Sequence, residues 1–180
     1  VKQTLKKPEP RQRYLSEEEY DKLISCSAPH LKDIILFAVE TGLRKEEFLS
    51  LRWEDVDFIA NRIHVRNTKS GRDRSVPLSE SGKKPLQNRY SNSAVAVYVF
   101  CNSEGARFKD IKTAFNNACK RAEIKDLQIH DLRKTFGSWR LQGIRGKKLS
   151  LLEVSKLLGH SSIDLTASTY AFLDEQNINL

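Results

Sequence analysis

The chain has 180 residues, which is enough for one domain with a substantial hydrophobic core but too few for two domains of ordinary size. Its 31 lysines and arginines exceed 23 acidic residues, and the formal net charge of +8 favours a polyanionic partner without identifying it. Three widely spaced cysteines argue against a disulfide framework or a zinc knuckle, and the longest apolar run, residues 94–101, is too short to span a bilayer.

The N-terminal part predicts a linker followed by three helices. Residues 1–13 combine two prolines with five basic residues and predict a linker. A capping box at 16–19 predicts a helix to about residue 27, and Pro29 suits the first turn of a second helix. Residues 31–41 are apolar over most of the helical circumference, so this helix should form the buried centre and end at Gly42.

Arg44 comes directly after that stop, at the start of a short third helix predicted over residues 45–51. A cation at a helix start opposes the helix dipole, so the position has a mild local cost. Either Arg44 forms an ordinary surface pair with Glu47 at i, i+3, or it serves a function.

In the middle of the chain, apolar residues recur at every second position. Three short strands are predicted around Val56–Phe58, Ile63–Val65 and Val76–Leu78, with turns at 60–61 and 69–72. The second turn is basic, and two interpretations stay open: a solvated hairpin tip, or a finger that lays Lys69 against a phosphate or a groove. Residues 79–93 predict a short helix or loop, residues 95–99 a brief strand, and residues 108–122 a helix that packs on the core.

A helix starting at His130 separates two faces. At about 100° per residue, Leu132, Phe136 and Trp139 share a sector of about 60°, while His130, Arg133 and Gly137 fall in a different one. The first sector is expected to face the core and the second a site, where Gly137 permits close approach of a backbone or ligand. The alternative is an amphipathic helix with a surface His and Arg.

The C-terminal part predicts two helices joined at a tight corner. The glycine-containing loop at 143–148 lacks the pattern of a P-loop, which argues against nucleotide binding. A capping box at 150–153 opens a helix that ends at Gly159, and another at 161–164 opens the helix that carries Tyr170. His160 should therefore lie in the corner, beside backbone amides able to help hold an anion.

Taken together, these motifs resemble the catalytic domain of the tyrosine recombinase (phage integrase) family. The motifs are residues 41–44 with Glu47, Lys69 in its hairpin, His130 to Arg133, residues 158–162, and Tyr170. The resemblance implies a mainly α (α+β) catalytic domain over 14–174, with a small three-stranded antiparallel sheet. It also implies that 1–13 is the linker from a missing N-terminal core-binding domain and that 175–180 is a truncated C-terminal tail.

The resemblance implies a role for each matched residue. Arg44 and Arg133 bind the phosphate, His160 is a third donor to it, and Glu47 orients the arginines. Tyr170 is the nucleophile, His130 assists as proton acceptor, and Lys69 protonates the departing 5′ oxygen. The product is a 3′-phosphotyrosyl DNA, formed without a metal or nucleotide cofactor. The chemistry agrees, because guanidinium groups are permanently charged forks suited to a phosphodiester whose charge spreads over its nonbridging oxygens.

The partners follow from the same resemblance. We expect double-stranded DNA, contacted by Arg66, Arg72, Arg74 and Lys134, with a homo-tetramer on DNA and a monomer for this fragment alone. We expect a recombinase of a phage or other mobile element in the bacterial cytosol, associated with the nucleoid and with no membrane. The alternatives are a type IB topoisomerase-like relaxing activity and a non-catalytic DNA-binding regulator. The spacing from His160 to Tyr170 is one residue longer than the family commonly has.

Overall fold

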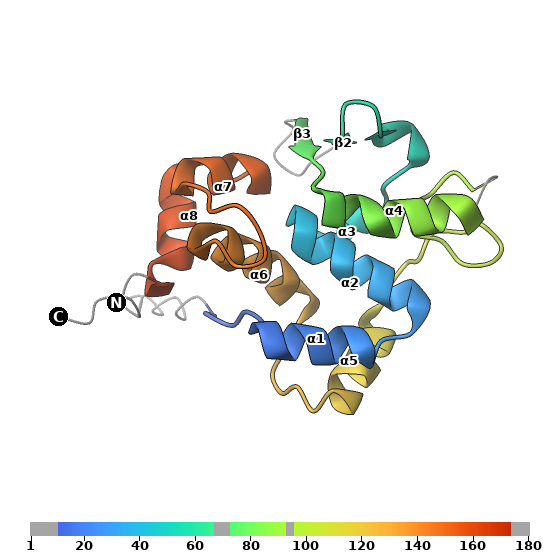
Figure 1. Ribbon diagram of the computed structural model, residues 1–180, viewed down its shortest axis with the longest axis horizontal. Coiled ribbons are helices and arrows are strands. Elements are labelled where there is room, and N and C mark those ends of the chain that lie inside the picture. Colours follow the sequence, from blue (N-terminus) through green and yellow to red (C-terminus); the bar gives the residue numbers. More distant parts are fainter. Residues whose placement is uncertain (1–10, 67–72, 93–95, 174–180) are drawn as a thin grey trace, which may run out of the picture.

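The computed structural model describes residues 11–66, 73–92 and 96–173 (Figure 1). The predicted turn with Lys69 and Arg72 therefore lies outside the described residues, as do most of the linker and the tail. None of the helices in the described ranges is long and apolar enough to cross a membrane.

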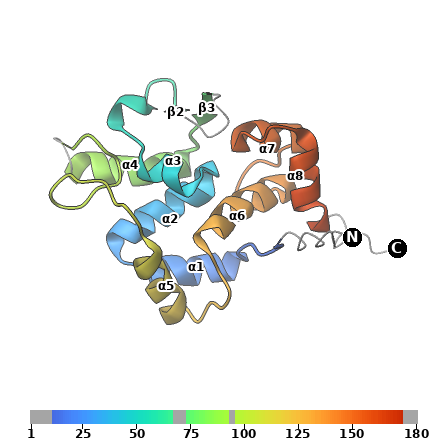
Figure 2. The same cartoon turned by 180° about the vertical axis from the view of Figure 1, so that it is seen from behind.

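Helix α2 (Pro29–Thr41) forms the centre of the molecule, as predicted. Seven of its thirteen residues are buried, and Gly42 ends it in a left-handed conformation with φ 65°. Helix α1 (Glu17–Ser25) packs on one side of α2, and α4 (Glu80–Asn92) and α6 (Ile129–Gln142) pack on others (Figures 1 and 2). The Ser16 capping box that opens α1 is present with both of its hydrogen bonds.

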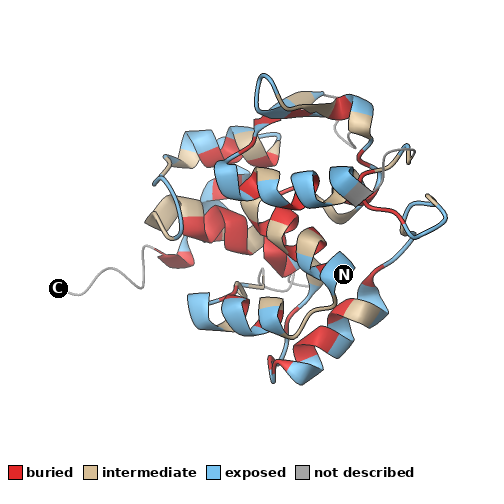
Figure 3. Cartoon of the chain, turned by 45° about the vertical axis from the view of Figure 1, so that its right-hand side comes forward, coloured by how far each residue is buried: buried red, intermediate tan, exposed pale blue. Residues whose placement is uncertain are grey.

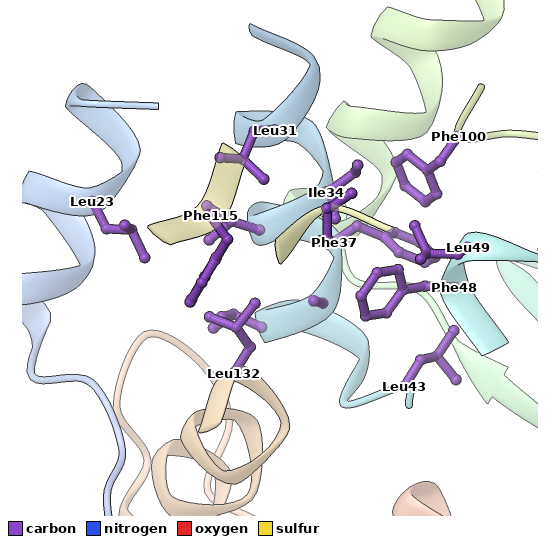
Figure 4. Packing of buried hydrophobic residues seen from close by; sticks show 14 of the residues in the cluster. Leu23, Leu31, Ile34, Phe37, Leu43, Phe48, Leu49, Phe100, Phe115 and Leu132 are labelled. Carbon is purple, nitrogen blue, oxygen red and sulfur yellow. The ribbon is translucent and has the colours of Figure 1, made fainter. Parts of the chain in front are cut away.

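The main core surrounds α2, and its four largest fully buried side chains are phenylalanines. Phe37, Phe48, Phe100 and Phe115 are each buried to within about one per cent of complete burial. Figure 4 shows these rings close to Leu31 and Leu132. Phe37 and Leu31 belong to α2, Phe48 to α3 (Lys45–Leu49), Phe115 to α5 (Lys112–Arg121) and Leu132 to α6, and Phe100 lies in the segment before α5. Exposed residues occupy the outer faces of the same helices (Figure 3).

The sheet has three short antiparallel strands in the order β1-β2-β3, as predicted. They are β1 (Val56–Asp57), β2 (Arg62–Val65) and β3 (Arg74–Pro77), preceded by the 3-10 turn η1 (Trp53–Asp55). Ile63 pairs with Val76, and both side chains are buried, whereas their neighbours along the strands face outward. Val65 pairs with Arg74, so the described ends of β2 and β3 lie side by side.

Helices α7 (Leu151–Leu158) and α8 (Ile163–Tyr170) pack on each other and on α6 at one end of the molecule (Figure 1). A second, smaller core lies between them and contains Phe136, Val154, Leu158, Tyr170, Phe172 and Leu173. Phe136 thus belongs to this small core, whereas Leu132 and Trp139 belong to the main one. Helix α6 therefore contributes side chains to both cores.

Three local predictions were wrong. Residues 80–92 form a full helix, because Leu86 is completely buried and packing on α2 outweighs the poor helix propensity of Gly82 and Pro85. The strand expected at residues 95–99 is not formed at its described positions, where only an isolated bridge joins Tyr98 to Arg52. The N-cap of α8 is Ser162 rather than Ser161.

Candidate active site

Glu47 binds Arg44 at the start of α3. The left-handed turn at Gly42 redirects the chain after α2, which makes Arg44 the N-cap residue. One Glu47 oxygen accepts from the Arg44 backbone amide at 2.8 Å, and the other accepts from Arg44 Nη1 at 3.1 Å. In the Arg44–Glu47 pair predicted from the spacing, the Arg44 side chain is 34% exposed and the Glu47 side chain 9% exposed. The guanidinium therefore remains accessible, while the carboxylate is shielded from solvent.

Arg74, at the start of β3, is the second partner of Glu47. Its Nη1 and Nη2 donate to the two carboxylate oxygens at 3.0 and 2.7 Å, and its Nε donates to the Leu157 carbonyl at 3.2 Å. Burial acts to raise the pKa of Glu47, but the hydrogen bonds from Arg74 and the Arg44 backbone outweigh it and leave that pKa below its ordinary value. The sequence indicated only a DNA contact for Arg74 and missed this pairing.

Arg133 connects α6 to two other elements. It is 5% exposed, and it donates to the Gly42 carbonyl at 2.7 Å and to the Leu158 carbonyl at 2.6 Å. Burial, reinforced by the charge of Arg44, lowers the pKa of Arg133 to about 9, so its guanidinium is still charged at neutral pH. Arg133 thus faces the C-terminal ends of α2 and α7.

His160 occupies the corner between α7 and α8. Gly159 ends α7 with φ 64°, and Nδ1 of His160 lies 2.6 Å from Oγ1 of Thr166, which is fully buried. Burial lowers the pKa of His160 to about 4, and the charges of Arg133 and Arg44 act in the same direction. The imidazole is thus neutral at pH 7. Thr166 was not identified from the sequence, although it lies on the turn of α8 that faces this corner.

Tyr170 is the last residue of α8, and its ring lies against Gly137 of α6. A Cβ atom added to Gly137 would be 2.0 Å from the tyrosine hydroxyl oxygen, so a side chain there would require Tyr170 to move. Tyr170 is 4% exposed; burial raises its pKa to about 12, and the charge of Arg133 opposes that rise. The close approach predicted for Gly137 is therefore made by Tyr170, despite the longer spacing from His160.

His130 begins α6 near the same cations. The surrounding protein lowers the pKa of His130, and the charges of Arg133, Lys134 and Arg44 add to the effect. His130 lines a cleft of about 830 Å³ together with Arg44 and Arg66. Charge interactions connect Arg133 with most of the other predicted site residues: Arg44, Glu47, His130, His160 and Tyr170.

Two of the predicted DNA contacts have partners outside the predicted site. Arg66 lines the same cleft, is 57% exposed on the side chain and pairs with Asp55 at 2.8 Å. Lys134 donates to the backbone carbonyl of Arg11, which joins α6 to the segment before α1. Lys69 and Arg72 are outside the described residues. Within the described part of the chain, no group of three or more His, Cys, Asp or Glu side chains could hold a metal ion.

Gly137→Ala should displace Tyr170 without a gain in stability. Alanine favours a helix by about 1 kcal/mol over glycine, but overpacking a buried contact costs about 1–3 kcal/mol. We expect amide hydrogen exchange in α8 to accelerate and the unfolding temperature not to rise. Gly82→Ala in α4 is the matched control, because its nearest neighbour would be the Ser79 hydroxyl at 3.3 Å. If Gly137→Ala left the exchange in α8 unchanged and raised the unfolding temperature as much as Gly82→Ala does, the contact between Gly137 and Tyr170 would be contradicted.

His160 should make folding stability depend on acid pH. Its pKa lies near 4 when folded and near 6.5 when unfolded, so the unfolded chain binds the proton first as pH falls. The free energy of unfolding should therefore keep its full value above pH 6.5. It should fall by roughly 1–3 kcal/mol between about pH 6.5 and 4 because of His160. Urea unfolding of the wild type and His160→Gln across this range measures it. If the free energy of unfolding changed with pH in the same way for both proteins, the lowered pKa of His160 would be refuted.

Solved structures similar to this chain include a recombinase and an integrase. The crystal structure of XerA recombinase superposes with a TM-score of 0.78 at 25% identity, covering 98% of this chain and 68% of that one. A lambda integrase dimer bound to a COC′ core site has the same fold, with a TM-score of 0.73 at 20% identity over 88% of this chain and 61% of that one. The fold and the gathered residues thus define the class of tyrosine recombinase catalytic domains, as the fold prediction stated.

The family model described as the phage integrase family matches residues 13–177, and this chain belongs to that family. The integrase of Salmonella phage P22 is 32% identical over 178 residues, covering 89% of this chain and 45% of the relative. Tyrosine recombinase XerA of Saccharolobus solfataricus is 32% identical over 163 residues, covering 89% and 53%. The chain thus spans about half the length of these curated relatives. Their names favour recombination over the topoisomerase-like and regulatory alternatives.

Proposed function

We propose that this chain is the catalytic part of a site-specific DNA recombinase that cleaves and rejoins DNA through a 3′-phosphotyrosyl intermediate. The observation that carries the proposal is the buried Tyr170 hydroxyl, held on the glycine face of α6 beside the charge of Arg133. A phenol enclosed next to a guanidinium suits attack on a phosphodiester, since the cation stabilises both the phenolate and the anionic phosphate.

Phosphate binding is assigned to Arg44, Arg133 and His160. Glu47 is neutralised largely by Arg74, so Arg44 and Arg133 retain positive charge for an anionic ligand. Arg44 lines the open cleft, and Arg133 is held rigidly by two backbone carbonyls. When Thr166 donates to Nδ1 of His160, the proton of the neutral ring is on Nε2, which then serves as the third donor.

The proton transfers are assigned to His130 and Lys69. Tyr170 must lose its proton during attack because its pKa is well above neutral, and the lowered pKa of His130 keeps that imidazole unprotonated and able to accept. Lys69 is proposed to protonate the departing 5′ oxygen. It lies between β2 and β3 in the sequence, and Arg74 at the first residue of β3 bonds directly to Glu47, which supports this assignment.

Double-stranded DNA is the proposed partner, with Arg66, Arg72 and Lys134 as candidate backbone contacts. Related solved structures include XerH bound to a palindromic difH substrate and a Tn1549 transposon integrase with circular intermediate DNA, which support this partner. We propose a monomer for the free chain, a tetramer on paired sites, and a role in a mobile element in the bacterial cytosol.

Covalent trapping on DNA tests the proposal. The protein is incubated with a nicked suicide duplex that carries the attachment site flanking its gene, and the products are separated on a denaturing gel. We expect a protein–DNA adduct, with the phosphate located on Tyr170 by peptide mass spectrometry. No adduct on the cognate duplex, or an adduct at another residue, would overturn the proposal. Relaxation of a supercoiled plasmid that lacks the site would instead favour the topoisomerase-like alternative.

A further inference from the structure

We propose that Arg74 is a positioning residue that holds the Arg44 and His160 halves of the phosphate site in register with the hairpin, rather than a contact to DNA. This inference rests on the proposed function. Arg74 is the first residue of β3, yet its side chain reaches both α3 and α7. It is therefore the one described side chain that hydrogen-bonds Glu47 and also the last turn of α7.

All three nitrogens of Arg74 already donate within the protein. Nη1 and Nη2 form a bidentate pair with Glu47, and Nε donates to Leu157. The Arg74 side chain is 11% exposed and Glu47 is 9% exposed, so the pair is shielded from solvent. Three of the five N–H groups of this guanidinium are thus used within the protein, two of them on a carboxylate that offsets its charge, whereas a DNA contact requires charge that faces the surface.

The last turn of α7 is held by two arginines from different elements. Arg74 takes the Leu157 carbonyl, and Arg133 takes the next carbonyl, that of Leu158. The final carbonyls of a helix lack partners within it and attract cations. The Arg74 side chain also packs on Gly159, where an added Cβ would lie 3.0 Å from Arg74 Cδ. Together these contacts determine where His160 lies relative to Arg133.

Arg74 also controls the partner of Arg44. Both Glu47 oxygens are shared, since Arg44 and Arg74 each donate to both of them. Without Arg74, the buried carboxylate would have Arg44 as its only cationic partner among the described residues, and it would compete with the DNA phosphate for that guanidinium. Arg74 therefore leaves Arg44 available to the substrate, although Arg74 itself does not touch it.

The test compares Arg74→Gln and Arg74→Lys with Arg66→Gln, which removes an exposed arginine from the adjoining strand end. Single-turnover adduct formation on the suicide duplex gives the cleavage rate, and anisotropy at several salt concentrations gives the affinity and its salt slope. We expect Arg74→Gln to lower the rate by about 100-fold, the scale of a small misplacement of catalytic groups, with affinity and slope unchanged. Lysine should rescue only partly, because it cannot form the bidentate pair.

A double mutant separates action through Glu47 from an independent effect. Adding Arg74→Gln to Glu47→Gln should cost much less than about 100-fold, because both changes break one network. If Arg74→Gln instead weakens DNA binding and reduces the salt slope by about one charge, with the cleavage rate unchanged at saturation, Arg74 is a phosphate contact and the inference is overturned. Full additivity of the two changes would also overturn it.

Hydrogen exchange on the free protein tests the inference even if no adduct forms. The His160 amide, which bonds the Ser155 carbonyl, and the Arg44 amide, which bonds Glu47, should both exchange faster in Arg74→Gln. The Arg66→Gln protein should match the wild type at both. Unchanged exchange in Arg74→Gln would overturn the inference, whereas failure of wild-type cleavage with the exchange effect present would refute the proposed function alone.

Discussion

Tyr170→Phe is expected to lower the rate of adduct formation by at least about 10⁴-fold, because the covalent bond to DNA requires the phenolic oxygen. The same change should leave folding almost intact. The ring packs in the small core with Phe136 and Leu158, and phenylalanine retains those contacts. DNA affinity should also persist, since Tyr170 is 4% exposed and contributes no charge at neutral pH.

Tyr14→Phe is the matched control for that experiment. Tyr14 packs against Phe172 with ring centroids 5.7 Å apart, so it borders the same small core from another segment. It should cleave at the wild-type rate, as judged by the gel assay under single-turnover conditions. An adduct formed at an appreciable rate by Tyr170→Phe would show that another residue is the nucleophile.

Arg133→Lys is expected to impair both catalysis and stability, although it preserves a positive charge. Lysine has no planar fork, so it cannot serve the Gly42 and Leu158 carbonyls together as Arg133 does. A buried carbonyl left without a partner costs about 1–3 kcal/mol, and we expect the free energy of unfolding to fall by about 2–4 kcal/mol. Loss of one preorganised donor to the phosphate should lower the cleavage rate by about 10²–10³-fold.

Urea unfolding and single-turnover cleavage, at protein concentrations above the dissociation constant, measure the two effects separately. Arg52→Lys is the control, because Arg52 is 49% exposed and pairs with the exposed Glu54 at 3.1 Å. Exposed pairs contribute about 0–1 kcal/mol, so this variant should be nearly wild type in both assays. If Arg133→Lys retained wild-type stability, its two carbonyl contacts would not be major determinants of the fold.

Local sequence signals determined most of the helix boundaries and nominated the residues of the candidate site. The Ser16 and Ser150 capping boxes and the glycines at 42 and 159 act within a few residues, so they do not depend on the rest of the fold. The same is true of the faces of α6, because helical periodicity alone separates Leu132 from Arg133. Motif order then identified the family, which the family match confirms.

Tertiary structure decided what these local signals leave open. Residues 80–92 are helical because they pack on α2, and the free energy of that burial does not appear in their own propensities. Arg74 lies in a basic stretch, and sequence could not separate it from its exposed neighbours; only the approach of α3 and α7 gives it buried partners. Likewise, the sequence determined that Gly137 permits a close approach, but which group comes near, the hydroxyl of Tyr170, depends on how α8 packs against α6.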